Sequence, residues 1–418
     1  MKVLLVNHSD VNGGAARAAN RLLMALRQHD AIDDARMLVS IKESRCDWIE
    51  GPTSAVAVKL AKAQSRLSRW GNLLYRSDNP GTHSPLSLVS NLSERINASD
   101  ADVVHLHWIN NGTLSIPDIG RINKPLVWTF HDMWPFCGAE HYTPSTRWAE
   151  GYLPGTRGSG ESGPDLNRLT WRSKKRHWKR PIHVIAPSTW MAECVRQSPL
   201  MRHWPVDVIP NAIDLDRWHP MPQDEARLAL GIPLGVKVVM FGALDNKDPR
   251  KGFDLLMTAQ SHLAVTAPDI VMLTVGAPPA SMGQRQGLKH ISLGRITDDE
   301  TMRQAYCASD VFVISSRQDN LPNTALESLA CGTPLVAFGI GGLSDIVSDK
   351  TLGDLVAPFD ACALARAIQH RLSIGCSRFS QAPLARHGHA LNNWSHAAIA
   401  MKHVDVYTSL LRSAGVTP

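Results

Sequence analysis

Short apolar runs alternate with segments of helical periodicity along most of this chain, and this alternation most constrains its fold. The pattern is typical of βαβ units, in which helices connect parallel strands. In the first half, strands are predicted at residues 2–7, 35–39, 103–106, 126–130, 183–186 and 207–210. In the second half, they are predicted at residues 237–242, 270–276, 290–293, 310–315 and 334–338. The sequence therefore predicts an α/β protein with two doubly wound, Rossmann-like domains.

The length of the chain agrees with two domains, because 418 residues exceed what one hydrophobic core usually supports. We predict a first domain over residues 1–215 and a second over residues 216–392. The segment 393–418 is expected to begin with a helix that Pro383 and Gly388 separate from the helices before it. This helix is expected to pack back on the first domain.

Residues 138–181 interrupt the pattern, because Gly and Pro are frequent there and apolar periodicity is weak. We predict an irregular insert in the first domain, and a long excursion of this kind is usually functional or disordered. The insert ends in a basic run, Arg172–Arg180, which contains Trp178 and directly follows Trp171. One interpretation is a solvated basic helix. The other is a surface for anionic lipid or phosphate, with both Trp side chains at headgroup level.

Composition excludes several classes of protein. The seven Cys residues form no C-x-x-C pair, which argues against a zinc module or a disulfide scaffold and favours a reduced, cytoplasmic protein. The opening apolar run at 2–7 is too short for a signal-peptide core. No apolar run approaches the length of a transmembrane helix, so any membrane contact is expected to be peripheral. The net charge of +6 indicates an anionic partner: a nucleotide, a nucleic acid or a membrane surface.

Two groups of residues with chemical potential follow predicted strands. Gly13 and Gly14 follow the opening strand and precede a helix, where glycine lets a ligand approach the backbone and the helix N-terminus favours anions. No G-x-G-x-x-G is present, which disfavours an NAD-dependent dehydrogenase. Arg250 and Lys251 follow the strand at 237–242, and two adjacent cations ahead of a helix can bind a diphosphate. The alternative is a solvated charged loop.

A third group follows the strand at 310–315 and contains Asp319 and Glu327. Thr324 and Glu327 have the spacing of a capping box, which would give Glu327 a structural role. Alternatively, a carboxylate on the first helical turn, beside free backbone amides, can accept hydrogen bonds from the vicinal hydroxyls of a ribose or sugar. Asp319 lies eight residues before Glu327, on the loop side of the same junction.

In this order, the motifs resemble those of the retaining glycosyltransferases of family 4, which have the GT-B fold of two Rossmann-like domains facing a central cleft. The resemblance covers nearly the whole chain. It rests on Gly13-Gly14, on the stretches 129–134, 186–190 and 209–214, and on Arg250-Lys251-Gly252 with Asp319 and Glu327. The stretch 129–142 and the insert further resemble members that assemble bacterial polysaccharides.

The resemblance implies a binding site for a nucleotide-sugar donor. Gly13 and Gly14 would line its diphosphate side, and His131 would contact the donor sugar near the reacting centre. Arg250 and Lys251 would neutralise the diphosphate.

The remaining implied donor contacts come from the third group. Asp319 would bind donor-sugar hydroxyls, and Glu327 would bind the nucleotide ribose. Between them, further donor contacts would come from Asn320, Leu321, Pro322, Asn323 and Thr324. The sequence departs from the family pattern at Asp319, where Glu is usual, at Ala243, where Arg is common, and at Ala212, where Gly is common. Arg250 would then supply the charge missing at Ala243.

The resemblance also implies the reaction: a sugar passes, with retention, from a UDP- or GDP-sugar to a glycan or lipid-linked acceptor in surface polysaccharide biosynthesis. In the family mechanism the departing diphosphate accepts the acceptor's proton, so the protein supplies positive charge instead of a strong base. We expect no cofactor and no metal ion, because no D-x-D motif directly follows a predicted strand. Nucleic acid is not an expected partner, since the basic residues form no recognised module.

Two other functions stay open: a GT-B nucleotide-sugar epimerase and a non-enzymatic binder of an anionic ligand. A further pair of residues, His105 and His107, lies along a predicted strand; we take their side chains to face opposite ways and expect no metal site there. We identify no Ser/His/Asp set in the sequence.

Overall fold

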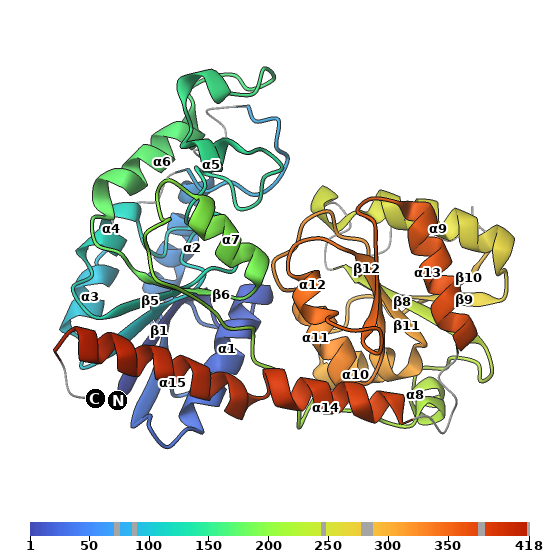
Figure 1. Cartoon of the computed structure of the whole chain (residues 1–418). Helices are drawn as coiled ribbons and strands as arrows, with labels where there is room; N and C mark the ends of the chain where they lie inside the picture. The colour runs from blue at the N-terminus through green and yellow to red at the C-terminus, as the bar shows by residue number, and fades with distance from the viewer. Residues whose placement is uncertain (71–75, 86–89, 244–247, 277–286, 375–380, 416–418) are drawn as a thin grey trace. The chain divides into compact units, whose positions relative to one another are not determined.

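The structure is a computed structural model that describes residues 1–70, 76–85, 90–243, 248–276, 287–374 and 381–415. It divides into two compact units (Figure 1). Unit 1 comprises Met1–Ala212 and Ile399–Pro418, and unit 2 comprises Ile213–Ala398. The chain therefore passes between units after residue 212 and again after residue 398, where we expected boundaries after 215 and 392.

Unit 1 is built on a parallel sheet that has seven strands among the described residues. In spatial order these are β3 (Ile49–Glu50), β2 (Asp34–Ile41), β1 (Lys2–Ser9), β4 (Val103–Leu106), β5 (Leu126–Thr129), β6 (His183–Ala186) and β7 (Val206–Val208). The helices before residue 212 are α1 (Gly14–Arg27), α2 (Ala55–Trp70), α3 (Leu92–Ala98), α4 (Ile116–Arg121), α5 (Arg147–Glu150), α6 (Leu166–His177) and α7 (Thr189–Gln197). The last helix, α15 (His396–Ser413), contributes its residues from Ile399 onward to unit 1.

Unit 2 is built on a second parallel sheet, with six strands among the described residues. In spatial order these are β10 (Lys289–Ser292), β9 (Ile270–Gly276), β8 (Lys237–Ala243), β11 (Val311–Ile314), β12 (Leu335–Phe338) and β13 (Gly353–Val356). Its helices are α8 (Gln223–Ala229), α9 (Phe253–Thr266), α10 (Asp299–Ala308), α11 (Asn323–Ala330), α12 (Leu343–Ile346), α13 (Ala361–Ile374) and α14 (Ala382–Trp394).

Both sheets are buried on both faces, which explains why their strands are continuous apolar runs. In β1, Leu4 and Val6 pack into one core, whereas Val3 and Leu5 pack into the core on the opposite face. Strand β11 divides its residues between two cores of unit 2 in the same alternating way. Two doubly wound α/β units are therefore confirmed.

The strand order reverses direction once in each sheet. In unit 1 this switch point lies between β1 and β4, and in unit 2 it lies between β8 and β11. In doubly wound sheets, ligands bind beyond the carboxyl ends of the strands at such a point. The loops after β1, β4, β8 and β11 are therefore the places to examine for a site.

The predicted strands all overlap observed ones, and β4, β6 and β9 begin and end where predicted. Two observed strands were not predicted, β3 and β13. Strand β3 has only two residues, and β13 has the sequence GDLV, whose Gly and Asp are unfavourable in strands.

The predicted separation of the last helix is wrong in detail. Pro383 and Gly388 lie inside α14, with Pro383 in the first turn, where proline is tolerated. The break comes at Ser395, which has an extended backbone and ends α14 before α15 begins. From Ile399 onward α15 packs in the core of unit 1, where Tyr407 is fully buried.

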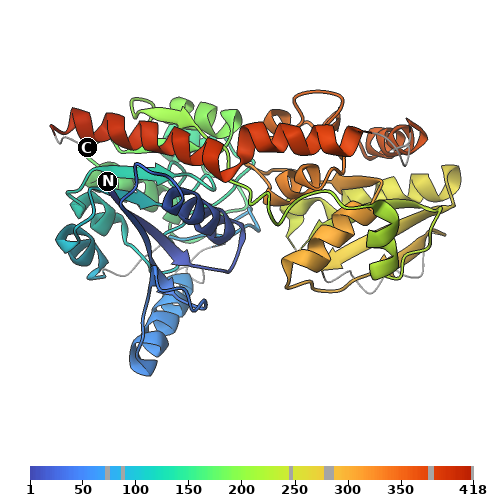
Figure 2. The ribbon, with the colours of Figure 1, turned by 90° about the horizontal axis from the view of Figure 1, so that it is seen from below.

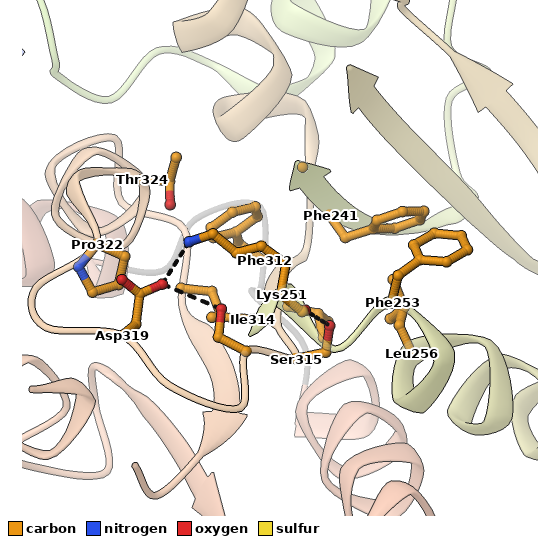
Figure 3. A pocket seen from close by; sticks show the side chains of 13 residues that line it. Phe241, Lys251, Phe253, Leu256, Phe312, Ile314, Ser315, Asp319, Pro322 and Thr324 are labelled. Atoms are coloured by element: carbon orange, nitrogen blue, oxygen red, sulfur yellow. Dashed lines mark hydrogen bonds and ion pairs between the residues drawn. The ribbon is translucent and has the colours of Figure 1, made fainter. Parts of the chain in front are cut away.

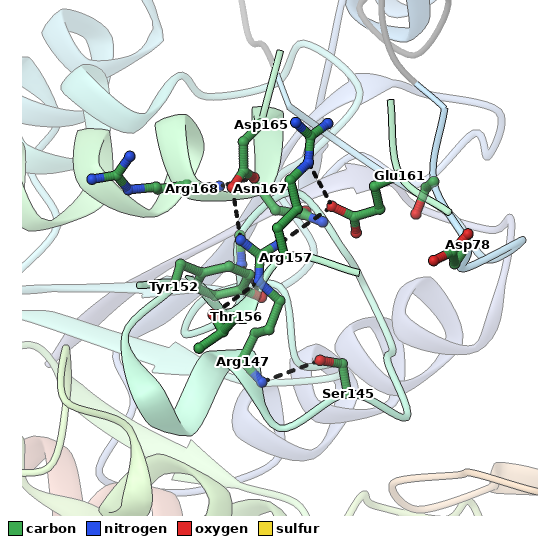
Figure 4. Close-up of polar contacts among 12 residues, drawn as sticks. Asp78, Ser145, Arg147, Tyr152, Thr156, Arg157, Glu161, Asp165, Asn167 and Arg168 are labelled. Atoms are coloured by element: carbon green, nitrogen blue, oxygen red, sulfur yellow. Dashed lines mark hydrogen bonds and ion pairs between the residues drawn. The ribbon is translucent and has the colours of Figure 1, made fainter. Parts of the chain in front are cut away.

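The insert is irregular only in part, which corrects the prediction for residues 138–181. It contains α5, a 3-10 turn at Pro154–Thr156, and α6. The buried Arg147 organises it: its guanidinium donates to Asp165 Oδ2 at 2.7 Å and to Glu161 Oε2 at 3.4 Å, and lies over the ring of Tyr152 (Figure 4). Burial raises the pKa of Glu161, although Arg147 and Arg157 oppose that shift.

For the basic run Arg172–Arg180 we gave two interpretations, a solvated basic helix and a surface for anionic lipid or phosphate with both Trp side chains at headgroup level. The second is wrong about the Trp side chains. Trp171 and Trp178 are only 6% exposed and belong to the core, so they do not lie at a headgroup level. Lys174 is fully buried; its Nζ donates to the carbonyl oxygens of Trp134, Cys137 and Gly138, and burial lowers its pKa well below the usual value. The exposed cations of the run are Arg172, Lys175, Arg176, Lys179 and Arg180.

Within the described part of the chain, no helix is both long enough and apolar enough to span a membrane. The six cysteines described are all free thiols, and Cys376 lies outside the described residues.

Candidate functional site

The switch point of unit 2 brings two of the predicted groups together. After β8, a 3-10 turn at Pro249–Lys251 leads through Gly252 into α9. The side chain of Asp248 caps this turn by accepting a hydrogen bond from Arg250 N at 3.0 Å. Because β11 pairs with β8, the loop after β11 that carries Asp319 lies against this turn.

Three charged side chains meet there, Arg250, Lys251 and Asp319, and we call them the charged cluster. Lys251 Nζ donates to Asp319 Oδ2 at 2.7 Å, and Arg250 Nη1 lies 3.7 Å from Asp319 Oδ1. Ser316 Oγ also donates to Asp319 Oδ2, at 3.2 Å (Figure 3). The Asp319 side chain is only 9% exposed, whereas Arg250 and Lys251 are 25% and 32% exposed. The cations therefore keep access to a ligand while the carboxylate is buried.

Electrostatics keep Asp319 ionised. Burial alone would raise its pKa, but the nearby charges of Lys251 and Arg250 outweigh it, so the pKa lies below its usual value. Arg250 is fixed in turn, because its Nη1 donates to Gln318 O at 3.1 Å and its Nη2 pairs with Asp248 at 3.0 Å.

Two glycines permit this close arrangement. Gly252 has φ +63°, and a Cβ there would lie 1.9 Å from the carbonyl oxygen of Ser315. Gly341 has φ +52°, and its Cβ would lie 1.8 Å from the carbonyl oxygen of Asp319. A side chain at either position would push apart the backbone segments that carry the charged cluster.

The helix after the cluster does not start as predicted. Helix α11 begins at Asn323, with Pro322 as its N-cap and no side-chain cap. Thr324 is therefore inside the helix, and the predicted capping box with Glu327 is wrong. Glu327 is 1% exposed, and its Oε2 accepts a hydrogen bond from the hydroxyl of Tyr306 at 3.2 Å.

The charged cluster borders a pocket with a polar edge and an apolar wall (Figure 3). It is lined by Phe241, Gly242, Lys251, Phe253, Leu256, Phe312, Val313, Ile314, Ser315, Ser316, Asp319, Pro322 and Thr324. Of the predicted residues, this pocket brings together Lys251, Asp319, Pro322 and Thr324. Those that do not line it are Arg250, Asn320, Leu321, Asn323 and Glu327. The side chain of Leu321 belongs to the hydrophobic core.

The other predicted residues lie in unit 1. Gly13, with φ +94°, is the N-cap of α1, and Gly14 is the first residue of that helix. No atom lies within 4 Å of a Cβ built on Gly13, so its backbone conformation, not crowding, favours glycine there. His131 follows β5, and its side chain is only partly buried.

His131 ends a row of four imidazoles, of which the other three are buried. We call this row the histidine column: His131, His107, His105 and His403. The rings of His131 and His107 stack at 5.2 Å, and those of His107 and His105 at 4.4 Å. His107 Nδ1 and His131 Nε2 share a hydrogen bond of 3.0 Å. The prediction that His105 and His107 face opposite ways is wrong, because side chains two residues apart along a strand lie on the same face.

Burial keeps the histidine column neutral. It lowers the pKa of His131 and of His403 to about 4, and the pKa of His105 and of His107 well below the usual value. His105 is held at both nitrogens, by the Tyr407 hydroxyl and by Thr129 Oγ1, each at 2.7 Å. The column therefore presents hydrogen-bonding groups without charge.

A second row, absent from our sequence predictions, joins Ser84, His141 and Asp132. His141 Nδ1 lies 2.6 Å from Asp132 Oδ2, and its Nε2 lies 2.8 Å from Ser84 Oγ. Asp132 also accepts hydrogen bonds from Trp108 Nε1 and from Trp134 N. Burial alone would raise the pKa of Asp132, yet these contacts hold that pKa below its usual value. The row ties three segments together beside His131 and thereby fixes that loop.

Sequence reasoning missed Ser316 and His107, the residues that bond Asp319 and His131. Ser316 directly follows the predicted strand at 310–315, and His107 directly follows the one at 103–106. Because ligands bind beyond the carboxyl ends of such strands, these positions offered a signal for both residues. Among the described residues, no three His, Cys, Asp or Glu side chains form a group that could hold a metal ion.

Comparison with known proteins gives this geometry a context. Two family models match the chain: Glycosyltransferase Family 4 over residues 12–217 and Glycosyl transferases group 1 over residues 235–373. A D-inositol 3-phosphate glycosyltransferase of Xylanimonas cellulosilytica is 27% identical over 328 residues, which is 73% of this chain and 71% of that protein. The protein of the same name from Mycolicibacterium smegmatis is 31% identical over 207 residues, 47% of this chain and 46% of its own length.

A solved structure supports the same conclusion for the fold. HepE from Anabaena, in complex with UDP and glucose, superimposes with a TM-score of 0.64 and 18% identity, and the match covers 98% of this chain and all of that one. Between them, the two family models span both units. The chain therefore belongs to the family 4 glycosyltransferases and has their GT-B fold of two Rossmann-like domains.

Proposed function

We propose that this glycosyltransferase moves a sugar, with retention, from a UDP- or GDP-sugar to a glycan or lipid-linked acceptor in surface polysaccharide biosynthesis. The observation that carries the proposal is the charged cluster at the switch point of unit 2, where Lys251 and Arg250 flank the buried Asp319. The glucose and UDP named for HepE support a nucleotide-sugar as the donor.

The cations serve the leaving group. A nucleoside diphosphate gains negative charge as its bond to the sugar breaks, so fixed positive charge stabilises the transition state more than the ground state. Arg250 is held by Gln318 O and Asp248, and Lys251 is held by Asp319. Because these contacts already exist, little reorganisation is needed when the diphosphate departs.

The proposed step needs no strong base from the protein. The bond between the sugar C1 and the diphosphate oxygen breaks, and a bond from the acceptor oxygen forms on the same face of the sugar. The acceptor's proton passes to the departing phosphate oxygen. Asp319, which stays ionised, would accept hydrogen bonds from sugar hydroxyls instead of donating a proton.

The other assigned residues orient the donor. Glu327, held by the Tyr306 hydroxyl, would bind the ribose, and the neutral His131 would hydrogen-bond to the sugar. Gly13, Gly14 and the backbone near Asn323 would contact the diphosphate or sugar. No cofactor or metal takes part in this proposal, and the free thiols agree with the reducing, cytoplasmic location that we propose.

Thermal-shift screening against nucleotide-sugars tests the donor. A donor at one hundred times its Kd stabilises the protein by about 2.7 kcal/mol, and Lys251→Ala should remove most of that shift. The matched control is Lys350→Ala, which removes an exposed lysine of the same unit. Equal shifts in Lys251→Ala and wild type would refute the assigned site. Conversion of the nucleotide-sugar without acceptor would identify an epimerase instead, and binding without turnover in any acceptor mixture would favour the non-enzymatic binder.

A further inference from the structure

Helix α2 turns an apolar stripe toward solvent. Val56 is 76% exposed, Leu60 67% and Leu67 48%, and the exposed Ala63 lies between them in sequence. The spacing of four, three and four residues places all of them on one face of the helix. At 1.5 Å per residue the stripe is about 16 Å long. Exposed apolar side chains are usually scattered singly, so a continuous stripe needs an explanation.

A row of cations flanks this stripe. Lys59, Lys62 and Arg66 are all exposed, and at 100° per residue they lie along one side of the apolar face. The sequence of α2 contains no Asp or Glu. The exposed surface of the helix is therefore apolar along its centre and positive along one edge.

The opposite side of α2 attaches it to unit 1. Ser65 is buried, and Gln64 lies so close to Gly112 that a Cβ there would come within 3.0 Å of the Gln64 side chain. Figure 2 shows α2, in mid blue, extending away from the sheet of its unit. The apolar stripe is thus not the face that attaches the helix.

We propose that α2 binds the surface of an anionic lipid membrane, with its apolar stripe in the acyl boundary and its cations at the headgroups. Binding of this kind depends on both buried apolar area and attraction to anionic lipid, and α2 supplies both on one face. The basic run Arg172–Arg180 offers exposed cations, but both of its tryptophans are in the core. The inference goes beyond the proposed function, because vesicle binding is measured without donor, acceptor or turnover.

Vesicle flotation with the full chain tests the proposal. Wild type should bind vesicles of phosphatidylglycerol and phosphatidylcholine, with weaker binding to phosphatidylcholine alone and in high salt. Leu60→Glu/Leu67→Glu should lower binding at least about tenfold, because it places charge in the acyl boundary. Lys59→Gln/Lys62→Gln keeps the stripe and should weaken binding to the anionic vesicles only.

The matched control is Leu228→Glu. Leu228, on α8 of unit 2, is 68% exposed, close to the 67% of Leu60, and this variant should bind as wild type does. Circular dichroism checks that the variants are folded. Wild-type binding by Leu60→Glu/Leu67→Glu, or loss of binding only when Arg172, Lys175 and Arg176 are changed to Gln, would overturn the proposal. A wild-type dimer in light scattering that this variant abolishes, without lipid binding, would make α2 an interface between copies and overturn it as well.

Discussion

The charged cluster of unit 2 follows the two strands of its switch point, and the histidine column of unit 1 runs past the end of β4, a strand of its own switch point, yet the two differ in charge. In the cluster, Lys251 and Arg250 are partly exposed and keep Asp319 ionised. In the column, burial keeps His131 and His107 neutral. The same topology can therefore present either fixed charge or uncharged hydrogen-bonding groups, and the environment of each side chain decides which.

This difference suits the two ends of a nucleotide-sugar. The diphosphate carries the charge that grows during transfer, so it needs cations that stay partly accessible. The sugar is uncharged, and a neutral imidazole can hydrogen-bond to it without paying for a buried charge. In the proposed function, the cations of the charged cluster therefore bind the diphosphate, and the neutral imidazole of His131 binds the sugar.

The largest expected effect comes from removing the cation that holds Asp319. Lys251→Ala should lower kcat by about 10²–10³, by analogy with the loss of one transition-state donor. Glu327→Ala should also nearly abolish transfer, because the ribose would lose its partner. Steady-state kinetics with matching circular dichroism check this, with Lys350→Ala as the control. Full activity in either folded variant would refute the role assigned to that residue in binding the donor.

The next effect concerns the backbone that brings the cluster together. Gly252→Ala should destabilise unit 2 by about 3 kcal/mol or more, because its Cβ would meet the carbonyl of Ser315 at 1.9 Å. Gly294→Ala, with a similar φ of +62° but no atom within 4 Å of its Cβ, should cost only about 1–2 kcal/mol. Urea unfolding measures both. Equal losses would mean that crowding at the cluster contributes nothing.

A third prediction concerns the pH dependence of the free energy of unfolding, which should differ between the two units. His131 and His403 have pKa values of about 4 when folded, below the ordinary value near 6.5, so the unfolded chain takes up protons first as pH falls. Their contribution is complete above about pH 7 and declines from about pH 6.5 toward pH 4, by about 2 kcal/mol for each residue at pH 5. Asp319, whose pKa is lowered, loses its contribution only below its ordinary value of 3.8.

Unit 1 should therefore lose more of its free energy of unfolding than unit 2 between pH 7.5 and pH 5. Hydrogen exchange in urea at pH 7.5 and pH 5 would follow the strands of each unit separately. His403→Gln should reduce the pH dependence of unit 1 and leave that of unit 2 unchanged. A larger loss of protection between pH 7.5 and pH 5 in β8 and β11 than in β4 and β5 would contradict the prediction.

The smallest effect tests the contact within the column. His107→Leu should lower kcat by up to about tenfold, because a hydrogen bond contributes roughly 0.5–1.5 kcal/mol and His131 would lose the one that orients its ring. His107→Asn, which retains a side-chain hydrogen-bonding group, should recover part of the rate. Identical kcat values for His107→Leu and the wild type would show that the histidine column contributes only to the core packing of unit 1.

The sequence was sufficient for most strands of the two sheets and for the loops that follow them. Residues on both faces of β1 are buried, so the strand is a continuous apolar run. Such a run can be recognised from the sequence alone, without knowledge of the neighbouring strands. The sequence also placed Lys251 and Asp319 on loops that follow two predicted strands. Their pairing was beyond the sequence, because it depends on which strands are neighbours and on the glycines that let two loops touch.

The insert was missed for a different reason. Arg147 organises the insert through Glu161 and Asp165, at separations of 14 and 18 residues, so no periodic pattern exists to detect. Burial of Trp171 and Trp178 likewise required the tertiary structure. The stacking of His105 on His107, by contrast, agrees with strand alternation, which places side chains two residues apart on one face, so this contact could have been predicted.

The return of α15 to unit 1 sets an order on synthesis. Tyr407 and Ile399 pack with Leu5 in the same core, so this face of the first sheet stays open while the whole of unit 2 is translated. About 190 residues separate Ala212 from Ile399, and at 5–20 residues per second they take about 10 to 40 s to make. Unit 2 can complete its core on the ribosome first, whereas unit 1, although it begins the chain, must wait with an uncovered apolar face that a chaperone could bind.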